Sequence, residues 1–184
     1  MLFLVVFLSA LLAAIGLGLL SGWSDIRGMT IPNSYSIGVL VAFAFAFMAC
    51  HLGGNPEPFG VLSAHLTVGA LVLGVTFFMT LGKMMGGGDS KLMTAYAFWM
   101  GPQNIIMFLF AMAAFGFLLG LLALFIKKAK PFKKVSEGSW LARVQSGQAV
   151  IPYGLPIMTG ALFAFLDGGY VSLSLLAGFL QAAG

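Results

Sequence analysis

Charged residues are scarce in this sequence. Only 8% of its 184 residues are Asp, Glu, Lys or Arg, whereas 60% are apolar. A soluble globular domain carries about 25% charged residues, so the composition excludes an ordinary soluble protein and indicates one embedded in a lipid bilayer. Because apolar runs occupy most of the chain, we expect a single membrane-embedded domain over residues 1–184, with no separate soluble module.

Cysteine and histidine are also nearly absent. The single Cys50 excludes an intrachain disulfide and a Cys-based zinc site. His51 and His65 lack the His-Glu-x-x-His spacing of zinc peptidases, so we expect no metal and no other cofactor. The run Gly-Gly-Gly-Asp-Ser-Lys at 86–91 lacks the spacing of a phosphate-binding loop. The net charge of +4 is better explained by membrane orientation than by nucleic-acid binding.

Long apolar runs are the dominant feature that is present. A membrane-crossing helix needs about 20 apolar residues, and the candidates are Leu2–Leu20, Tyr35–Cys50, Phe59–Leu81, Ile105–Ile126 and Ala149–Leu166. Two shorter runs are Leu92–Met100, which Gly101-Pro102 ends, and Tyr170–Leu180. The pattern predicts an all-α polytopic membrane protein with about six transmembrane helices, one of them short and following a glycine-rich loop. Whether the last run spans the membrane stays open.

The cations are confined to three segments of the chain. They are Arg27, then Lys83 and Lys91, then Lys127, Lys128, Lys130, Lys133, Lys134 and Arg143. If the short run at 92–100 crosses the membrane, all of them lie on one side, which the positive-inside rule assigns to the cytoplasm. We therefore predict an outside N-terminus and a mobile, basic cytoplasmic loop at about 127–148. Its cations could bind anionic lipid head groups, although fixing the topology suffices to explain them.

Two of the five acidic residues, Asp25 and Asp89, fall on the predicted cytoplasmic side, in loops at helix ends. Ionisable groups at such depth are costly and tend to be functional. Two neighbouring carboxylates share a proton. One can then take a proton from water while the other polarises a scissile carbonyl, as in an aspartic protease. Gly86, Gly87 and Gly88 would let the chain approach a substrate backbone closely.

The same two acids could also have other roles. Asp89 could simply cap a helix, and Asp25 could simply pair with Arg27. A small non-enzymatic transporter or assembly factor could use both acids for ion coupling. An intramembrane protease acting on other single-span proteins would have the same chemistry and a different substrate.

Three motifs resemble those of the prepilin peptidases, the GxGD-type membrane aspartyl proteases that process type IV pilin precursors. The first is Asp25-Ile26-Arg27 followed by Ile31-Pro32-Asn33, and the second is the glycine-rich run at 86–91. The third is Ile151-Pro152-Tyr153-Gly154-Leu155-Pro156. Their order and spacing spread the resemblance over most of the chain.

The resemblance implies an aspartic-type endopeptidase with Asp25 and Asp89 as catalytic residues. It would remove a short basic leader from a prepilin at the cytoplasmic face of the bacterial inner membrane, with the lipid bilayer and pilus assembly machinery as further partners. Residues of the structural motifs would be Pro32, Asn33, Pro152 and Gly154. The Cys-x-x-Cys methyltransferase segment of larger members has no counterpart here, so the chain resembles the short class of tight-adherence (Flp-type) pili.

The resemblance also suggests substrate-binding residues. These are Gly86, Gly87, Gly88, Lys91, Arg27 and Lys83. As a hypothesis, one of the three cations attracts an acidic residue that many pilins carry just after the cut.

Overall fold

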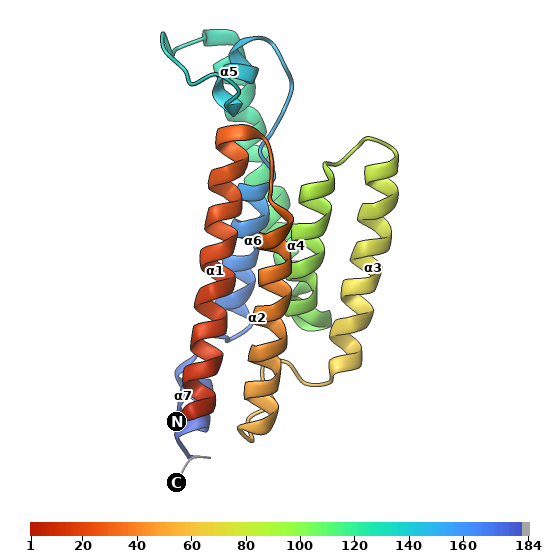
Figure 1. Cartoon of the computed structure of the whole chain (residues 1–184), viewed down its shortest axis with the longest axis vertical. Coiled ribbons are helices and arrows are strands. Elements are labelled where there is room, and N and C mark those ends of the chain that lie inside the picture. Colours follow the sequence, from red (N-terminus) through yellow and green to blue (C-terminus); the bar gives the residue numbers. More distant parts are fainter. Residues whose placement is uncertain (182–184) are drawn as a thin grey trace.

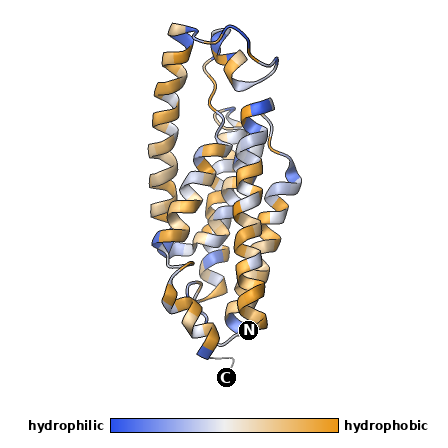
Figure 2. Ribbon diagram, turned by 90° about the vertical axis from the view of Figure 1, so that its left-hand side faces the viewer, coloured by the Kyte–Doolittle hydropathy of each residue, from blue (hydrophilic) through white to orange (hydrophobic). Residues whose placement is uncertain are grey.

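The computed structural model describes residues 1–181, which form helices and no strand. The helices are α1 (Leu2–Gly28), α2 (Asn33–Leu52), α3 (Leu62–Leu81), α4 (Gly87–Ala129), α5 (Trp140–Gln145), α6 (Gly154–Asp167) and α7 (Leu173–Gln181). Helices α1 to α4 are each long and apolar enough to cross a membrane. The long helices lie side by side (Figure 1), and apolar residues predominate along their lengths (Figure 2). The predicted all-α polytopic membrane protein is confirmed.

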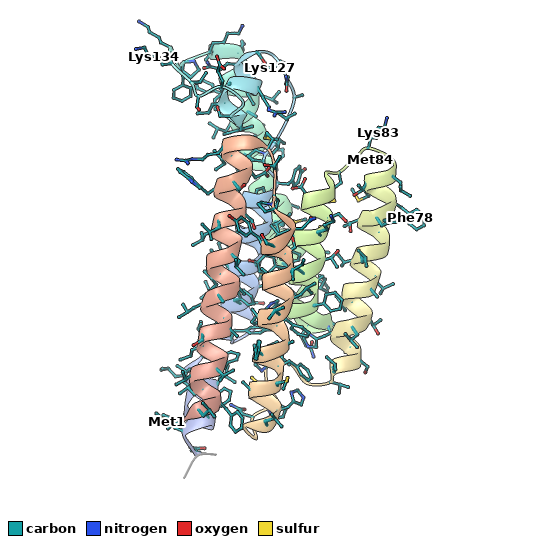
Figure 3. The ribbon with its side chains drawn as sticks, in the orientation of Figure 1. Met1, Phe78, Lys83, Met84, Lys127 and Lys134 are labelled. Carbon is teal, nitrogen blue, oxygen red and sulfur yellow. The ribbon has the colours of Figure 1, made fainter. Side chains whose placement is uncertain are left out.

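Helix α4 is a hairpin of two arms. At Gly101 the backbone adopts φ 55° and ψ −169°, which interrupts the helix. Lys83, before α4, and Lys127, near its end, both lie at the upper end of the bundle in Figure 3. The first arm (residues 87–100) is about 21 Å long at 1.5 Å per residue, too short for a full crossing. A short element after the glycine-rich loop, ended at Gly101, is therefore confirmed, although its helix begins earlier than the apolar run.

Helix α1 buries one face along its whole length. The buried positions recur every three or four residues: Phe7, Leu11, Ala14, Gly18, Ser21 and Asp25. Small residues on this face allow close packing, since a Cβ added to Gly18 would overlap the sulfur of Met158 on α6. The stripe therefore directs Asp25 into the bundle.

The prediction that Asp25 lies in a loop after α1 is wrong. The helix continues to Gly28 and ends where Met29 adopts a left-handed conformation (φ 55°) and donates its N–H to the Asp25 carbonyl. The helix persists because its packed face extends beyond the apolar run. The same holds for Asp89, which lies in the first turn of α4 rather than before it.

An aromatic cluster fixes the end of the bundle where α4 reverses. His65 of α3 is fully buried, with its ring nitrogens 2.7 Å from the Phe98 carbonyl and 2.6 Å from the Phe59 carbonyl. The Trp99 indole donates to the Val39 carbonyl of α2 at 3.0 Å. These bonds satisfy buried polar groups around Gly101 and join three helices there. Helix α3 packs mainly against α4, and near its start the His65 ring also stacks on Phe43 of α2, with ring centroids 5.7 Å apart.

The segment predicted as a basic loop has structure of its own. Helix α4 includes Lys127 and Lys128, and the hydroxyl of Ser139 caps α5 by accepting the N–H of Ala142. Trp140 is buried against the second arm of α4 (residues 102–129) and donates to the Val150 carbonyl at 2.9 Å. A small apolar cluster thus holds α5 over the end of α1 (Figure 1).

Helix α7 lies at the opposite end, beside the N-terminus (Figure 1). It packs through Phe179 on Phe7, with ring centroids 5.7 Å apart. Its nine residues reach about 13 Å, which is less than half the hydrocarbon thickness of about 30 Å. The last apolar run therefore does not span a membrane as a helix.

Candidate active site

The site is assembled where three sequence motifs meet at one end of the bundle. Asp25 comes from the last turns of α1, Asp89 from the first turn of α4, and Gly154 from the start of α6. Residues of these motifs are far apart in the chain, so only the packing of the helices brings them together.

Asp25 is held by the N-terminus of α6. The backbone N–H of Gly154 donates to its Oδ2 at 2.8 Å, and the side chain is only 4% exposed. The first N–H groups of a helix have no partner within the helix and are well placed to bind an anion. A Cβ on Gly154 would lie 3.1 Å from the Ser21 carbonyl oxygen and 3.2 Å from the Asp25 Cβ. Glycine at this position therefore permits the close contact between α6 and α1.

Asp89 is held by the helix that carries it. It is the third residue of α4, and its carboxylate accepts a hydrogen bond from the backbone of Gly86, the residue that precedes the helix. This is the side-chain contact that an acid at this position makes in a capping box. The neighbouring Ser90 donates to the Thr76 hydroxyl of α3 at 2.8 Å, which anchors the turn from the other side. The start of α4 is thus fixed on both sides of the acid.

Two further contacts join the glycine-rich run to the start of α2. The Lys91 ammonium donates to the Asn33 side-chain oxygen at 2.9 Å. A Cβ on Gly88 would lie 3.1 Å from the Ile31 Cβ, so the backbone packs closely there. Lys91 and Asn33 therefore connect the two motifs structurally.

Both acids line one open cavity of about 1270 Å³, and Asp89 lies within electrostatic reach of Asp25. The walls come from the end of α1, the last turns of α3, both arms of α4 and the segment 148–153. A space of this size holds several residues of a peptide. The two carboxylates therefore face a common space in which a substrate and a water could meet.

The predicted site residues divide into two groups. Lining the cavity beside the two acids are Lys83, Gly86 and Gly88. Outside the lining are Arg27, Pro32, Asn33, Gly87, Lys91, Pro152 and Gly154. Of these, Arg27 is exposed on the outer side of α1, with its guanidinium carbon 4.5 Å from the centroid of the Trp23 ring.

Several residues of the lining escape sequence reasoning. Lys127 belongs to the predicted basic loop, yet it reaches the cavity because α4 continues as a helix past the apolar run. Tyr153 stands out in the sequence only as part of a proline motif, and Met84 and Met85 only as packing residues. A signal for Lys127 is available, since helical spacing from Leu124 and Leu121 places all three on one face.

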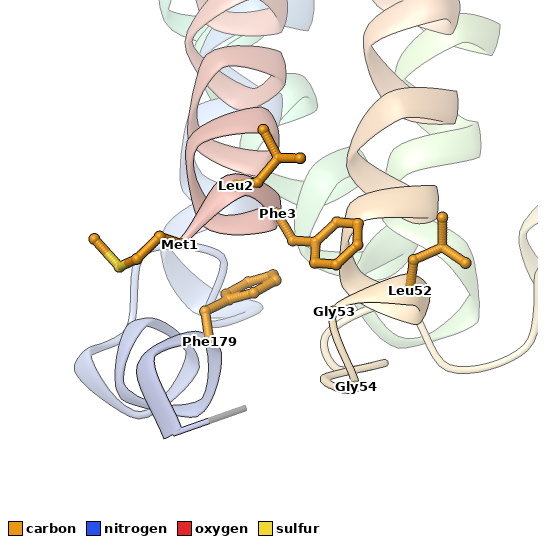
Figure 4. A pocket seen from close by; sticks show the side chains of 7 residues that line it. All are labelled: Met1, Leu2, Phe3, Leu52, Gly53, Gly54 and Phe179. Atoms are coloured by element: carbon orange, nitrogen blue, oxygen red, sulfur yellow. The ribbon is translucent and has the colours of Figure 1, made fainter. Parts of the chain in front are cut away.

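The described residues 1–181 contain no group of three His, Cys, Asp or Glu side chains that could hold a metal. A second cavity, of about 420 Å³, lies at the opposite end near Met1, Leu52 and Phe179 (Figure 4). Its seven lining residues carry no ionisable side chain. Groups suited to acid–base chemistry therefore line only the larger of these two cavities.

A carboxylate pair facing a peptide-sized cavity fits hydrolysis of an amide bond. Residues 11–121 match the family model described as the type IV leader peptidase family. The chain belongs to this family. The match contains Asp25 and Asp89, whereas Gly154 lies beyond it. No curated protein and no solved structure matches the chain. The leader peptidase family thus supports a peptidase of the membrane. The matched segment covers α2 and α3 completely and most of α1 and α4.

Proposed function

We propose that this leader peptidase is an aspartic-type endopeptidase that removes the short basic leader from type IV, Flp-like prepilins. The observation that supports it most is that Asp25 and Asp89, from two separate motifs, line the same cavity. A transporter that uses the acids for ion coupling would place them near the middle of the membrane. Here both lie in the terminal turns of their helices.

The proposed reaction divides general acid and general base work between the two carboxyl groups. The ionised carboxylate takes a proton from a water molecule as the water oxygen attacks the scissile carbonyl carbon. The protonated partner donates a hydrogen bond and then its proton to the carbonyl oxygen. Collapse of the tetrahedral intermediate breaks the C–N bond. The proton taken from water passes to the leaving amine, and one hydroxyl proton of the intermediate returns to the partner carboxylate, which restores the starting state of the pair. The hydrogen bonds from Gly154 and Gly86 keep the two carboxylates in place during these steps.

The charge distribution supports a cytoplasmic site in the bacterial inner membrane. All nine Lys and Arg residues belong to segments at the cavity end of the bundle, including Lys83, Lys127 and Lys134 at the top of Figure 3. Basic residues gather on the cytoplasmic side of membrane proteins. A basic leader would then remain in the cytoplasm while the apolar part of the prepilin stays in the bilayer.

The test is co-expression of a prepilin with Asp25→Asn and Asp89→Asn variants. Each variant keeps a side-chain oxygen that can accept the backbone N–H but loses the carboxylate, so cleavage falls by about 100-fold or more. Asp167→Asn, exposed at the opposite end, is the matched control and retains full cleavage. A cleaving Asp25→Asn or Asp89→Asn protein would contradict the proposal.

A further inference from the structure

Methionines are concentrated in the wall of the catalytic cavity. Six of the eleven methionines of the chain line it: Met29, Met79, Met84, Met85, Met93 and Met112. They come from the end of α1, from α3, from the loop after α3 and from both arms of α4. We call this set the methionine wall.

The methionine wall is more exposed than the core methionines, although Met93 and Met112 also pack against the core. All six side chains are half-buried or exposed, whereas Met100 and Met158 in the core are at most 1% exposed. Methionine is unbranched and has a flexible, polarisable thioether, so it can fill spaces of different shape. Surfaces rich in methionine accept apolar partners of varied sequence by repacking. The wall is therefore suited to apolar side chains whose identity changes from one substrate to another.

The charges beside the wall indicate which part of a substrate it takes. Lys83 and Lys127 are exposed and line the cavity from two separate projections, the loop after α3 and the end of α4 (Figure 3). Asp25 and Asp89 are the only acids in the lining. A basic leader would be repelled by the two lysines. An apolar segment meets Val75 and Leu124 as well as the methionines.

We propose that the methionine wall is an adaptable subsite for the apolar segment on the mature side of the scissile bond. It is continuous with the catalytic pair, so a chain bound there enters the reaction directly. Helix α3, which packs mainly against α4, forms one side of this subsite. The inference rests on the proposed function, because it needs a substrate with a basic leader and an apolar mature segment.

The first test replaces two flexible methionines of the wall by β-branched isoleucine. Wild-type enzyme cleaves a panel of prepilins with Ala, Leu, Ile or Phe after the scissile bond at rates within about tenfold of one another, because flexible side chains refill the space. In Met79→Ile/Met93→Ile, β-branched side chains hold a fixed shape, and the spread widens to about 100-fold, as in a rigid apolar pocket.

The matched control is Met48→Ile/Met107→Ile, which replaces two methionines outside the lining. It keeps the wild-type spread. If the rates of Met79→Ile/Met93→Ile fall by one common factor over the whole panel, the subsite proposal is overturned.

The second test locates the substrate. Met79→Cys is combined with Asp89→Asn to prevent turnover, and the fully buried Cys50 can stay in place. With a mild thiol oxidant added, a single cysteine on the mature side of the prepilin forms a disulfide with the new cysteine, whereas one in the leader does not. Preferential coupling of the leader, or no coupling at all, overturns the subsite. The proposed function fails separately, when the enzyme with both aspartates leaves the same prepilin uncleaved.

Discussion

The two ends of the bundle use their polar groups in opposite ways. At the end where α4 reverses, buried donors such as Trp99 and Tyr170 bond to backbone carbonyls within an aromatic cluster. At the other end, Asp25 and Asp89 each accept a backbone hydrogen bond and still face an open cavity. The first end, the closed end, fixes the helices, and the second, the open end, leaves both carboxyl groups at the wall of a cavity. Substitutions at the two ends should therefore affect different properties, stability at the first and catalysis at the second.

The largest effect on stability is expected from Gly101→Ala at the closed end. The positive φ strains any side chain there, and the new Cβ would lie 2.6 Å from the His65 ring. We expect the free energy of unfolding to fall by about 2–4 kcal/mol through backbone strain and overpacking. Thermal unfolding in detergent measures it. The control is Gly74→Ala on α3, where an added Cβ meets nothing within 4 Å. Equal stability of Gly101→Ala and Gly74→Ala would show that the packing around Gly101 does not determine the stability of the bundle.

The next effect is expected on catalysis, from Gly154→Ala at the open end. Its Cβ would press on the Ser21 carbonyl and on Asp25, moving the N–H that holds the carboxylate. A displacement of about 1 Å can lower a rate by about 100-fold, so we expect prepilin cleavage to fall by about 10-fold to 100-fold. Gly16→Ala, with nothing within 4 Å of the added Cβ, is the control on α1. Full activity of Gly154→Ala would show that this contact does not position the acid.

A smaller effect is expected from Thr76→Val, which removes the acceptor of the Ser90 hydroxyl next to Asp89. A buried donor left without a partner lowers stability by about 1–3 kcal/mol. Thr67→Val on the same helix is the control, because its exposed hydroxyl bonds only to the Ser63 carbonyl one turn earlier. Thermal unfolding compares them. Similar stability of both variants would mean that Ser90 finds another partner.

The smallest effect concerns the cations. Lys83 lines the cavity, whereas Arg27 lies against Trp23 outside it. If Lys83 attracts an acidic residue after the cut, Lys83→Gln slows cleavage of an acidic substrate by about 2-fold to 5-fold, because exposed charge pairs contribute up to about 1 kcal/mol. A neutral substrate and the Arg27→Gln control keep the wild-type rate. Equal slowing of both substrates would contradict a role for the charge.

Much of the fold could be predicted from apolar runs and charge placement. A bilayer requires long apolar helices, and the confinement of the cations to three segments favoured an element at 92–100 that returns the chain across the bundle. The end of the short helix at Gly101-Pro102 was predicted because glycine and proline interrupt helices. The end of α1 lies at Gly28 rather than at the predicted Leu20, because hydropathy alone does not reveal the buried stripe that Gly18 and Asp25 share.

The site was only partly predictable. The motifs identified the acids, but the bond between Asp25 and Gly154 joins residues 129 positions apart, and no local pattern encodes it. The catalytic role of the acids and the substrate remain predictions. The sequence did not predict the methionine wall, because its six members come from segments that meet only after folding.

Helix α3 has a consequence for how the protein is made. Its main helical neighbour in the described bundle, α4, follows it in the chain. During synthesis α3 therefore enters the lipid before its main partner exists, and its own apolar side chains must largely keep it there. The first arm of α4, too short to span, can settle only against helices already inserted. During synthesis, a helix that inserts largely through its own hydropathy therefore precedes one that needs packing partners. A polar substitution on the lipid face of α3 should impair membrane insertion before it impairs folding.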